Sequence, residues 1–124
     1  MLHKQQKVKK TMKEKILVTG SRSFGNITLM QQELQKLGNI HVIHGGATGA
    51  DATAQAVCEA LAIPTTVVQP LRTDINTYFL HRNAEMVGMC DEVLAFWNGK
   101  SRGTKFTIDY AKARGLKVNI ILFT

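Results

Sequence analysis

The sequence predicts an α/β fold in which about five parallel strands form one sheet with helices on both faces. Short apolar runs alternate along the chain with segments whose apolar residues recur at the spacing of an α-helix, and glycine or proline follows most of these segments. Strands that alternate with helices run parallel, because each helix returns the chain to the same end of the sheet. We therefore expect a three-layer, Rossmann-like doubly wound sheet with strand order 3-2-1-4-5, in preference to the flavodoxin-like order 2-1-3-4-5.

The individual elements follow from local sequence patterns. An apolar run at 16–19 predicts the first strand, and Gly20 ends it. The first helix is expected over 27–37, between Asn26, which can cap its first turn, and Gly38, which can end it. The same criteria predict strands at 40–44, 65–68, 93–97 and 118–123, and helices at 50–61, 76–89 and 104–114.

Composition limits the classes of protein that the chain can belong to. It has 124 residues, 44% of them hydrophobic, which suits one packed domain. No apolar stretch approaches the ~20 residues that a membrane helix needs, so we expect a cytoplasmic protein without a membrane partner. Cys58 and Cys90 have no zinc-type spacing to other cysteines or histidines, and we expect free thiols, no metal and no cofactor.

The net charge of +7 is concentrated at the N-terminus. Residues 1–15 contain six lysines against one glutamate, which gives +5 of that total. We therefore expect a basic tail over residues 1–14 and a folded domain over 15–124. Such a tail suits either sequence-independent contacts with nucleic-acid phosphates or a solvated leader.

Three glycine-rich turns are expected at the carboxyl edge of the sheet, where ligands bind in open α/β folds. They follow the first, second and fourth strands at 20–25, 45–51 and 98–104. Each turn alone is explained by loop geometry, but together they predict a phosphate or nucleotide cradle, because glycine lets the backbone approach an anion and helix N-termini supply N–H groups. A Walker A sequence and a GxGxxG fingerprint are both absent. The predicted ligand-binding residues of these turns are Gly20, Ser21, Arg22, Gly45, Gly46, Thr48, Gly49, Asp51, Gly99, Ser101, Arg102, Gly103 and Thr104.

Three further side chains have two interpretations each. Arg82 and Asn83 interrupt an apolar helix, and Arg82 either pairs with Glu85 on a solvated face or reaches a phosphate or ribose. Trp97, at the end of a strand, either stacks on a base or covers the sheet edge. We include Arg82, Asn83 and Trp97 among the predicted ligand-binding residues.

Four motifs carry a resemblance to a known family. TGSR at 19–22, VIHGGATGAD at 42–51, RNAEM at 82–86 and VLAFWNGKSRGT at 93–104 resemble the YspA-type (cpYpsA-related) branch of the SLOG superfamily. This superfamily joins the DNA-processing protein DprA and the cytokinin-activating LOG enzymes. The resemblance covers roughly residues 15–123 and implies a Rossmann-like domain that binds nucleotides or nucleotide-derived ligands, such as ADP-ribose derivatives.

The resemblance also implies candidate catalytic residues. LOG enzymes cleave the N-glycosidic bond of a nucleoside monophosphate with a helix arginine and a glutamate that follows a glycine-threonine pair. Arg82 matches the arginine and Gly103-Thr104 match the pair, but the stretch 105–107 contains no glutamate. Glycosidic cleavage needs a carboxylate, so Arg82 with Glu85 is the candidate catalytic set, and Asp51 is the other available acid.

Three functions are consistent with these features. The first is a sensor or sequestering module that binds a nucleotide or an ADP-ribose-like ligand. The alternative is a LOG-like phosphoribohydrolase acting on nucleoside monophosphates. A second alternative is DprA-like nucleic-acid binding aided by the lysine tail. The relation to LOG enzymes further implies a homo-oligomer, a dimer or larger.

Overall fold

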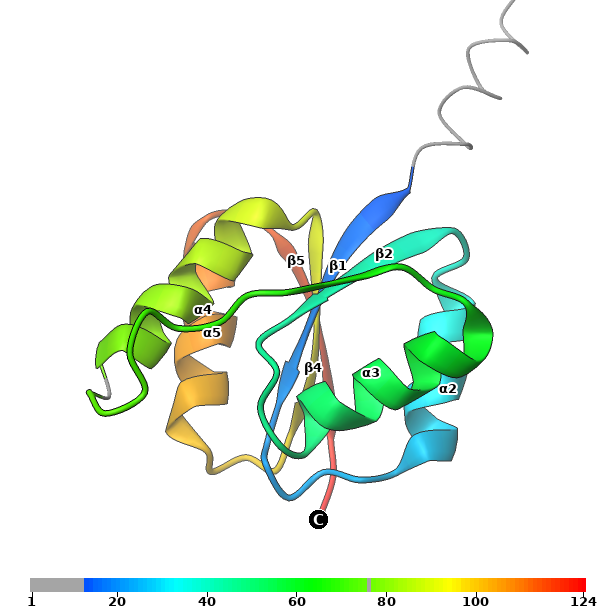
Figure 1. Ribbon diagram of the computed structural model, residues 1–124, viewed down its shortest axis with the longest axis horizontal. Helices are drawn as coiled ribbons and strands as arrows, with labels where there is room; N and C mark the ends of the chain where they lie inside the picture. The colour runs from blue at the N-terminus through cyan, green and yellow to red at the C-terminus, as the bar shows by residue number, and fades with distance from the viewer. Residues whose placement is uncertain (1–12, 76) are drawn as a thin grey trace, which may run out of the picture.

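The computed structural model describes residues 13–75 and 77–124, which form one five-stranded parallel sheet of order β3-β2-β1-β4-β5 (Figure 1). Both the fold class and the strand order predicted from the sequence are confirmed. The strands are β1 (Glu14–Gly20), β2 (Ile40–His44), β3 (Thr65–Val67), β4 (Glu92–Trp97) and β5 (Lys117–Leu122), and the helices are α2 (Ile27–Lys36), α3 (Ala50–Leu61), α4 (Thr77–Met89) and α5 (Arg102–Ala113).

The helices cover the two faces of the sheet in pairs, with α2 and α3 on one face and α4 and α5 on the other (Figure 1). Side chains of β1 alternate between the two cores: Ile16 and Val18 pack with α2 and α3, whereas Leu17 packs with α4 and α5. All three are fully buried. This burial on both faces explains the continuous apolar run, which is typical of a central parallel strand.

Several element ends differ from the predicted ones by one or two residues. The strand β1 begins at Glu14 because that residue pairs with Ile40 of β2. The helix α5 begins at Arg102 rather than at 104. Asn26 caps α2 as predicted, and its side-chain oxygen accepts a hydrogen bond of 3.0 Å from the Leu29 N–H.

The strand order creates a crevice between β1 and β4. The chain proceeds from β1 through β2 to β3 on one side and then crosses to β4 on the other side of β1. Connections that leave two adjacent parallel strands in opposite directions leave a gap beyond their carboxyl ends. Gly20 at the end of β1 lies beside Phe96 of β4, so the turns after these strands border the gap.

The remaining predictions of this kind concern the N-terminal tail, the two cysteines and membrane-spanning helices. The predicted basic tail lies outside the described residues except for 13 and 14. Cys58 and Cys90 are buried free thiols, and burial raises the pKa of Cys58 to about 11. No helix in 13–75 or 77–124 is long and apolar enough to cross a bilayer.

Candidate functional site

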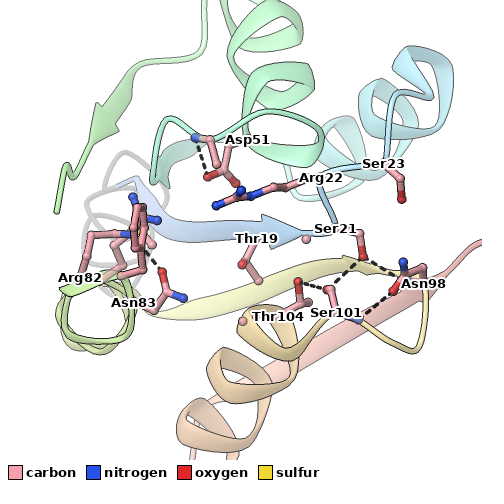
Figure 2. A pocket seen from close by; sticks show the side chains of 15 residues that line it. Thr19, Ser21, Arg22, Ser23, Asp51, Arg82, Asn83, Asn98, Ser101 and Thr104 are labelled. Atoms are coloured by element: carbon pink, nitrogen blue, oxygen red, sulfur yellow. Dashed lines mark hydrogen bonds between the residues drawn. The ribbon is translucent and has the colours of Figure 1, made fainter. Parts of the chain in front are cut away.

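A cavity of about 480 Å³ lies at the carboxyl edge, between the turns after β1 and β4 and one face of α4 (Figure 2). In the close view, Arg82 and Asn83 lie at one side of it and Ser21, Ser101 and Asn98 at the other, with Asp51 and Arg22 between them. Its volume is in the range that holds a nucleotide-sized molecule. Its walls are formed by Thr19, Gly20, Ser21, Arg22, Ser23, Ala47, Asp51, Phe79, Arg82, Asn83, Met86, Asn98, Ser101, Gly103 and Thr104.

A chain of hydroxyl groups joins the first and third glycine-rich turns. The Ser101 Oγ donates a hydrogen bond of 2.8 Å to the Thr104 Oγ1 and lies 3.2 Å from the Ser21 Oγ. The Ser21 Oγ in turn accepts from the Asn98 N–H at 3.1 Å. The side-chain oxygen of Asn98 accepts the N–H groups of residues 100 and 101. These bonds hold the first turn of α5 against the end of β1, although Ser21 and Ser101 are 80 positions apart.

The first turn of α5 supplies donors to this side of the cavity. The N–H groups of residues 102–104 have no acceptor within the helix, and the helix dipole makes this end positive. Gly103 is helical, and a Cβ built on it would meet no atom within 4 Å. Glycine at this position is therefore not required by packing, and Gly103 lines the cavity with its backbone uncovered by a side chain. Gly20 differs, since a Cβ there would lie 2.7 Å from the Ala50 Cβ.

The second glycine-rich turn uses its N–H groups internally. The N–H groups of Gly45 and Ala47 donate to the Asp51 Oδ2 at 3.1 and 3.2 Å, and the Gly46 N–H donates to the His44 Nδ1 at 3.0 Å. His44 is buried, and its Nε2 lies 2.6 Å from the Gln55 Oε1. These three backbone donors are thus occupied, and the turn positions Asp51 at the cavity wall instead of presenting its own donors there.

Asp51 is a buried carboxylate close to the charge of Arg82. It is 8% exposed, and burial raises its pKa, while the N–H groups of Ala47 and Gly45 and the charge of Arg82 oppose that rise. Among the described residues no donor bonds its Oδ1, and Asp51 lines the cavity. One carboxylate oxygen therefore remains available to accept a hydrogen bond from a bound molecule, such as a sugar hydroxyl.

Arg82 joins α4 to the loops after β2 and β3. Its Nη1 donates to the carbonyl oxygens of Gly45 at 2.6 Å and Val68 at 3.1 Å, and its Nε donates to the Asn83 Oδ1 at 2.9 Å. It is 7% exposed, and burial lowers its pKa. Arg82 therefore faces the sheet edge, and no ion pair with Glu85 is present among the described residues.

Glu85 lies on a different surface from the main cavity. It is exposed and lines another hollow of about 310 Å³ with Tyr78, His81 and Arg82. The structure thus brings Asp51, and not Glu85, into the cavity with Arg82. Arg82 and Glu85 are one helical turn apart and both line the smaller hollow, but only Arg82 also lines the main cavity.

Several predicted site residues surround the cavity without lining it. Trp97 is half-buried, and its Nε1 donates to the Ser101 carbonyl oxygen at 3.0 Å, so it covers the turn into α5. Gly49 adopts a positive φ of 80°, and a Cβ there would overlap the backbone of Arg22, which packs the first two turns together. Gly99 and Arg102 are exposed outside the lining, and Gly45, Gly46 and Thr48 line an adjoining cavity of about 280 Å³.

The cavity also contains residues that sequence reasoning did not select. In the sequence, Phe79 and Met86 look like ordinary apolar positions of a helix and Asn98 looks like part of a loop, but all three line the cavity. Phe79 lies three residues before Arg82, which places both on one helix face, and this spacing could have indicated it. In 13–75 and 77–124, no group of three or more His, Cys, Asp or Glu residues could hold a metal ion.

Comparison with known proteins shows the fold. The chain matches no protein-family model and no curated protein sequence. It resembles the X-ray structure of DNA processing protein A (DprA) from Streptococcus pneumoniae, with 20% identity and a TM-score of 0.79 over 90% of this chain and 51% of that one. A structure of DNA processing protein A from Helicobacter pylori, solved for its single-stranded DNA binding mode, gives 18% identity and a TM-score of 0.71 over 93% of this chain and 68% of that one.

A third structure extends the comparison. TM1055, a structural-genomics target, is 21% identical with a TM-score of 0.66 over 86% of this chain and 72% of that one. The chain thus spans about half the length of the S. pneumoniae DprA structure. At these identities the likeness establishes a shared Rossmann-like fold.

Proposed function

We propose that this protein binds a nucleotide or a nucleotide-derived ligand, such as an ADP-ribose derivative, in the cavity at the carboxyl edge, and acts as a sensor or sequestering module. The observation that carries the proposal is the combination of an open helix N-terminus with a buried carboxylate in one cavity of about 480 Å³. A nucleotide has both a phosphate and a sugar. The helix N-terminus suits the phosphate, and the carboxylate suits the sugar. The motifs that resemble the SLOG superfamily support the same assignment.

The phosphate would lie against the first turn of α5. Free N–H groups, the helix dipole and the hydroxyls of Ser101 and Thr104 are all suited to a phosphate. The open backbone at Gly103 gives an anion room to approach. Arg22, which is exposed at the rim and lines the cavity, adds a positive charge.

The sugar would lie beside Asp51. A ribose presents hydroxyl donors, and the Oδ1 of Asp51 is an acceptor that the described residues leave unused. Because Asp51 is buried, a hydroxyl that reaches it is largely removed from water, which strengthens the hydrogen bond. The rigid Arg82 beside it favours the ionised carboxylate.

Two alanine variants test the proposal as a matched pair. Gly103→Ala adds one methyl group at a residue that lines the cavity, and Gly88→Ala adds one to α4 at an exposed position, and neither methyl would meet an atom within 4 Å. Both substitutions favour helix, so neither should lower stability. By calorimetry with AMP and ADP-ribose, we expect Gly103→Ala to weaken binding about tenfold, the effect of losing one hydrogen bond to a charged group, and Gly88→Ala to leave it unchanged.

Two outcomes of these binding measurements would contradict the proposal or a part of it. Wild-type protein that binds neither ligand would refute the proposal. Equal affinities of the wild type and Gly103→Ala would remove the first turn of α5 from the site.

A second function, phosphoribohydrolase activity, is favoured by the position of Asp51. A carboxylate in the cavity beside Arg82 could stabilise the positive charge that develops on the sugar during glycosidic cleavage. Chromatography of AMP incubated with the protein would then show free adenine. This release should disappear in Asp51→Asn and persist in Glu85→Gln, and the absence of adenine from the wild-type reaction would leave the binding function alone.

Single-stranded DNA binding is the remaining candidate, favoured by the two DprA structures and by exposed basic side chains at the same edge. Arg22, Lys100 and Arg102 are all exposed around the turns that border the cavity. Phosphate contacts of this kind weaken as salt rises. Binding of the full chain at low salt that survives deletion of residues 1–12 but is lost in Arg22→Gln with Arg102→Gln would assign the DNA to this edge and not to the tail.

A further inference from the structure

Phe79 lies where the main cavity meets a second one. The cavity of about 280 Å³ shares Phe79, Arg82, Arg22 and Ala47 with the main cavity, and is otherwise lined by the turn after β2 and the loop after β3. The two cavities are therefore adjoining parts of one hollow surface. A molecule longer than a sugar phosphate can extend from one into the other past the Phe79 ring.

The Phe79 ring is held next to a fixed guanidinium group. The Arg82 Cζ lies over the ring at 5.6 Å from its centroid. The guanidinium is fixed by its bonds to the carbonyl oxygens of Gly45 and Val68, and a Cβ at Gly45 would overlap it. Nucleobases stack in proteins on aromatic rings and on the planes of arginine side chains.

Gln69 supplies a polar group in the second cavity. It is exposed, lines this cavity, and its side-chain amide bonds to no other residue among those described. A Cβ at Gly46 would lie 2.9 Å from its Nε2, which places the amide directly over the turn. A primary amide both donates and accepts, so it matches the paired donor and acceptor groups on the edge of a base.

We propose that Phe79 receives the base of the bound nucleotide, so that the base lies across the ring from the main cavity into the second one with its edge toward Gln69. This inference rests on the proposed function, in which the phosphate lies at α5 and the sugar at Asp51. It assigns to Phe79 the stacking role that the sequence suggested for Trp97. Trp97 instead bonds the turn into α5 through its Nε1 and lines neither cavity.

The test compares ligands with and without a base. Calorimetry would measure the affinities of AMP and of ribose 5-phosphate for wild type, Phe79→Leu and Phe106→Leu. Phe106 is the matched control, because it is a half-buried phenylalanine of α5 that stacks on Tyr110 outside both cavities. We expect Phe79→Leu to weaken AMP binding about tenfold, the usual scale for one base–aromatic stack, and to leave ribose 5-phosphate binding unchanged. Phe106→Leu should change neither affinity.

The outcomes separate this inference from the function on which it rests. Equal losses of AMP and ribose 5-phosphate affinity in Phe79→Leu would overturn the stacking role and leave nucleotide binding intact. Selective loss of AMP affinity in Trp97→Phe, with Phe79→Leu unaffected, would return the role to Trp97. If wild type binds neither ligand, the proposed function itself fails, and the inference fails with it.

A measurement on the wild-type protein keeps the inference testable if Phe79→Leu does not fold. The chain has five phenylalanines, so selective labelling gives few ring signals for NMR. AMP should shift the Phe79 ring protons upfield through the ring current of the stacked base, and ribose 5-phosphate should not. Identical shifts with both ligands would contradict stacking.

Discussion

At the scale of single residues, two buried side chains of opposite charge, Asp51 and Arg82, hold the turn after β2 in place. Asp51 accepts the backbone donors of the second turn, and Arg82 donates to the carbonyl of the same turn. Each group is buried at a cost that its hydrogen bonds partly offset. Replacing either one therefore changes stability as well as any ligand binding.

Loss of Arg82 should destabilise the fold. Arg82→Met keeps most of the side-chain volume but leaves two carbonyl oxygens without their donor and Asp51 without the neighbouring cation. We expect the free energy of unfolding in urea to fall by about 2–4 kcal/mol. Arg114→Met, at an exposed arginine that lies over Tyr110, is the control and should change it little. Equal effects of the two substitutions would show that the bonds of Arg82 contribute nothing.

Asp51 should make stability depend on pH. Because burial raises its pKa above the ordinary 3.8, the folded chain binds this proton more tightly than the unfolded chain does. The free energy of unfolding should therefore decrease as pH rises from 3.8 through the raised pKa, and recover on acidification. Asp51→Asn keeps an oxygen for the two N–H donors and should remove this dependence.

Urea unfolding between pH 4 and 7 measures the free energy of unfolding of the wild type and of Asp51→Asn. The value for the wild type minus that for Asp51→Asn should be larger at pH 4 than at pH 7. A difference that does not vary with pH would show that the pKa of Asp51 is the same in both states.

At the scale of elements, the side chain of Asn26 caps the first turn of α2 and fixes where this helix begins. The Asn26 cap of α2 lies away from the cavity, which makes it a test of local stability alone. Asn26→Ala removes the acceptor for the Leu29 N–H and should cost about 1 kcal/mol of unfolding free energy. Asn26→Asp should restore it, and nucleotide affinity should be the same in all three proteins. An affinity change in Asn26→Ala would mean that α2 is coupled to the site.

At the scale of the whole molecule, the folded unit should not need the first twelve residues. Within the described residues, β1 begins at Glu14, whose N–H donates to the Asn39 carbonyl oxygen, and the Lys13 Nζ bonds the side chain of the same asparagine. Deletion of residues 1–12 should therefore leave the melting temperature unchanged. Deletion of residues 1–17 also removes the fully buried Ile16 and Leu17 and should unfold the chain. A large loss of melting temperature on the shorter deletion would contradict this boundary.

Most of the architecture could be predicted from local pattern and connectivity. The run at 16–19 and the cap at Asn26 are short-range features, and alternating strands and helices permit few topologies. The convergence of three turns on one edge follows from parallel strands alone. What each turn binds could not be predicted in the same way. The second turn has the sequence of an anion cradle, but three of its N–H groups donate to the side chains of Asp51 and His44.

By itself the sequence determined the order of the elements and the set of residues brought to the carboxyl edge, and it favoured the observed strand order over one alternative. Only the tertiary structure decided which of them face the cavity: Asp51 rather than Glu85, and Phe79 rather than Trp97. The physical reason is the distance in sequence over which the interactions act. Helix and strand patterns depend on residues that are close in sequence. Arg82 instead contacts Gly45 across 37 positions and Ser21 contacts Ser101 across 80, so these contacts form only when the strands have assembled into the sheet.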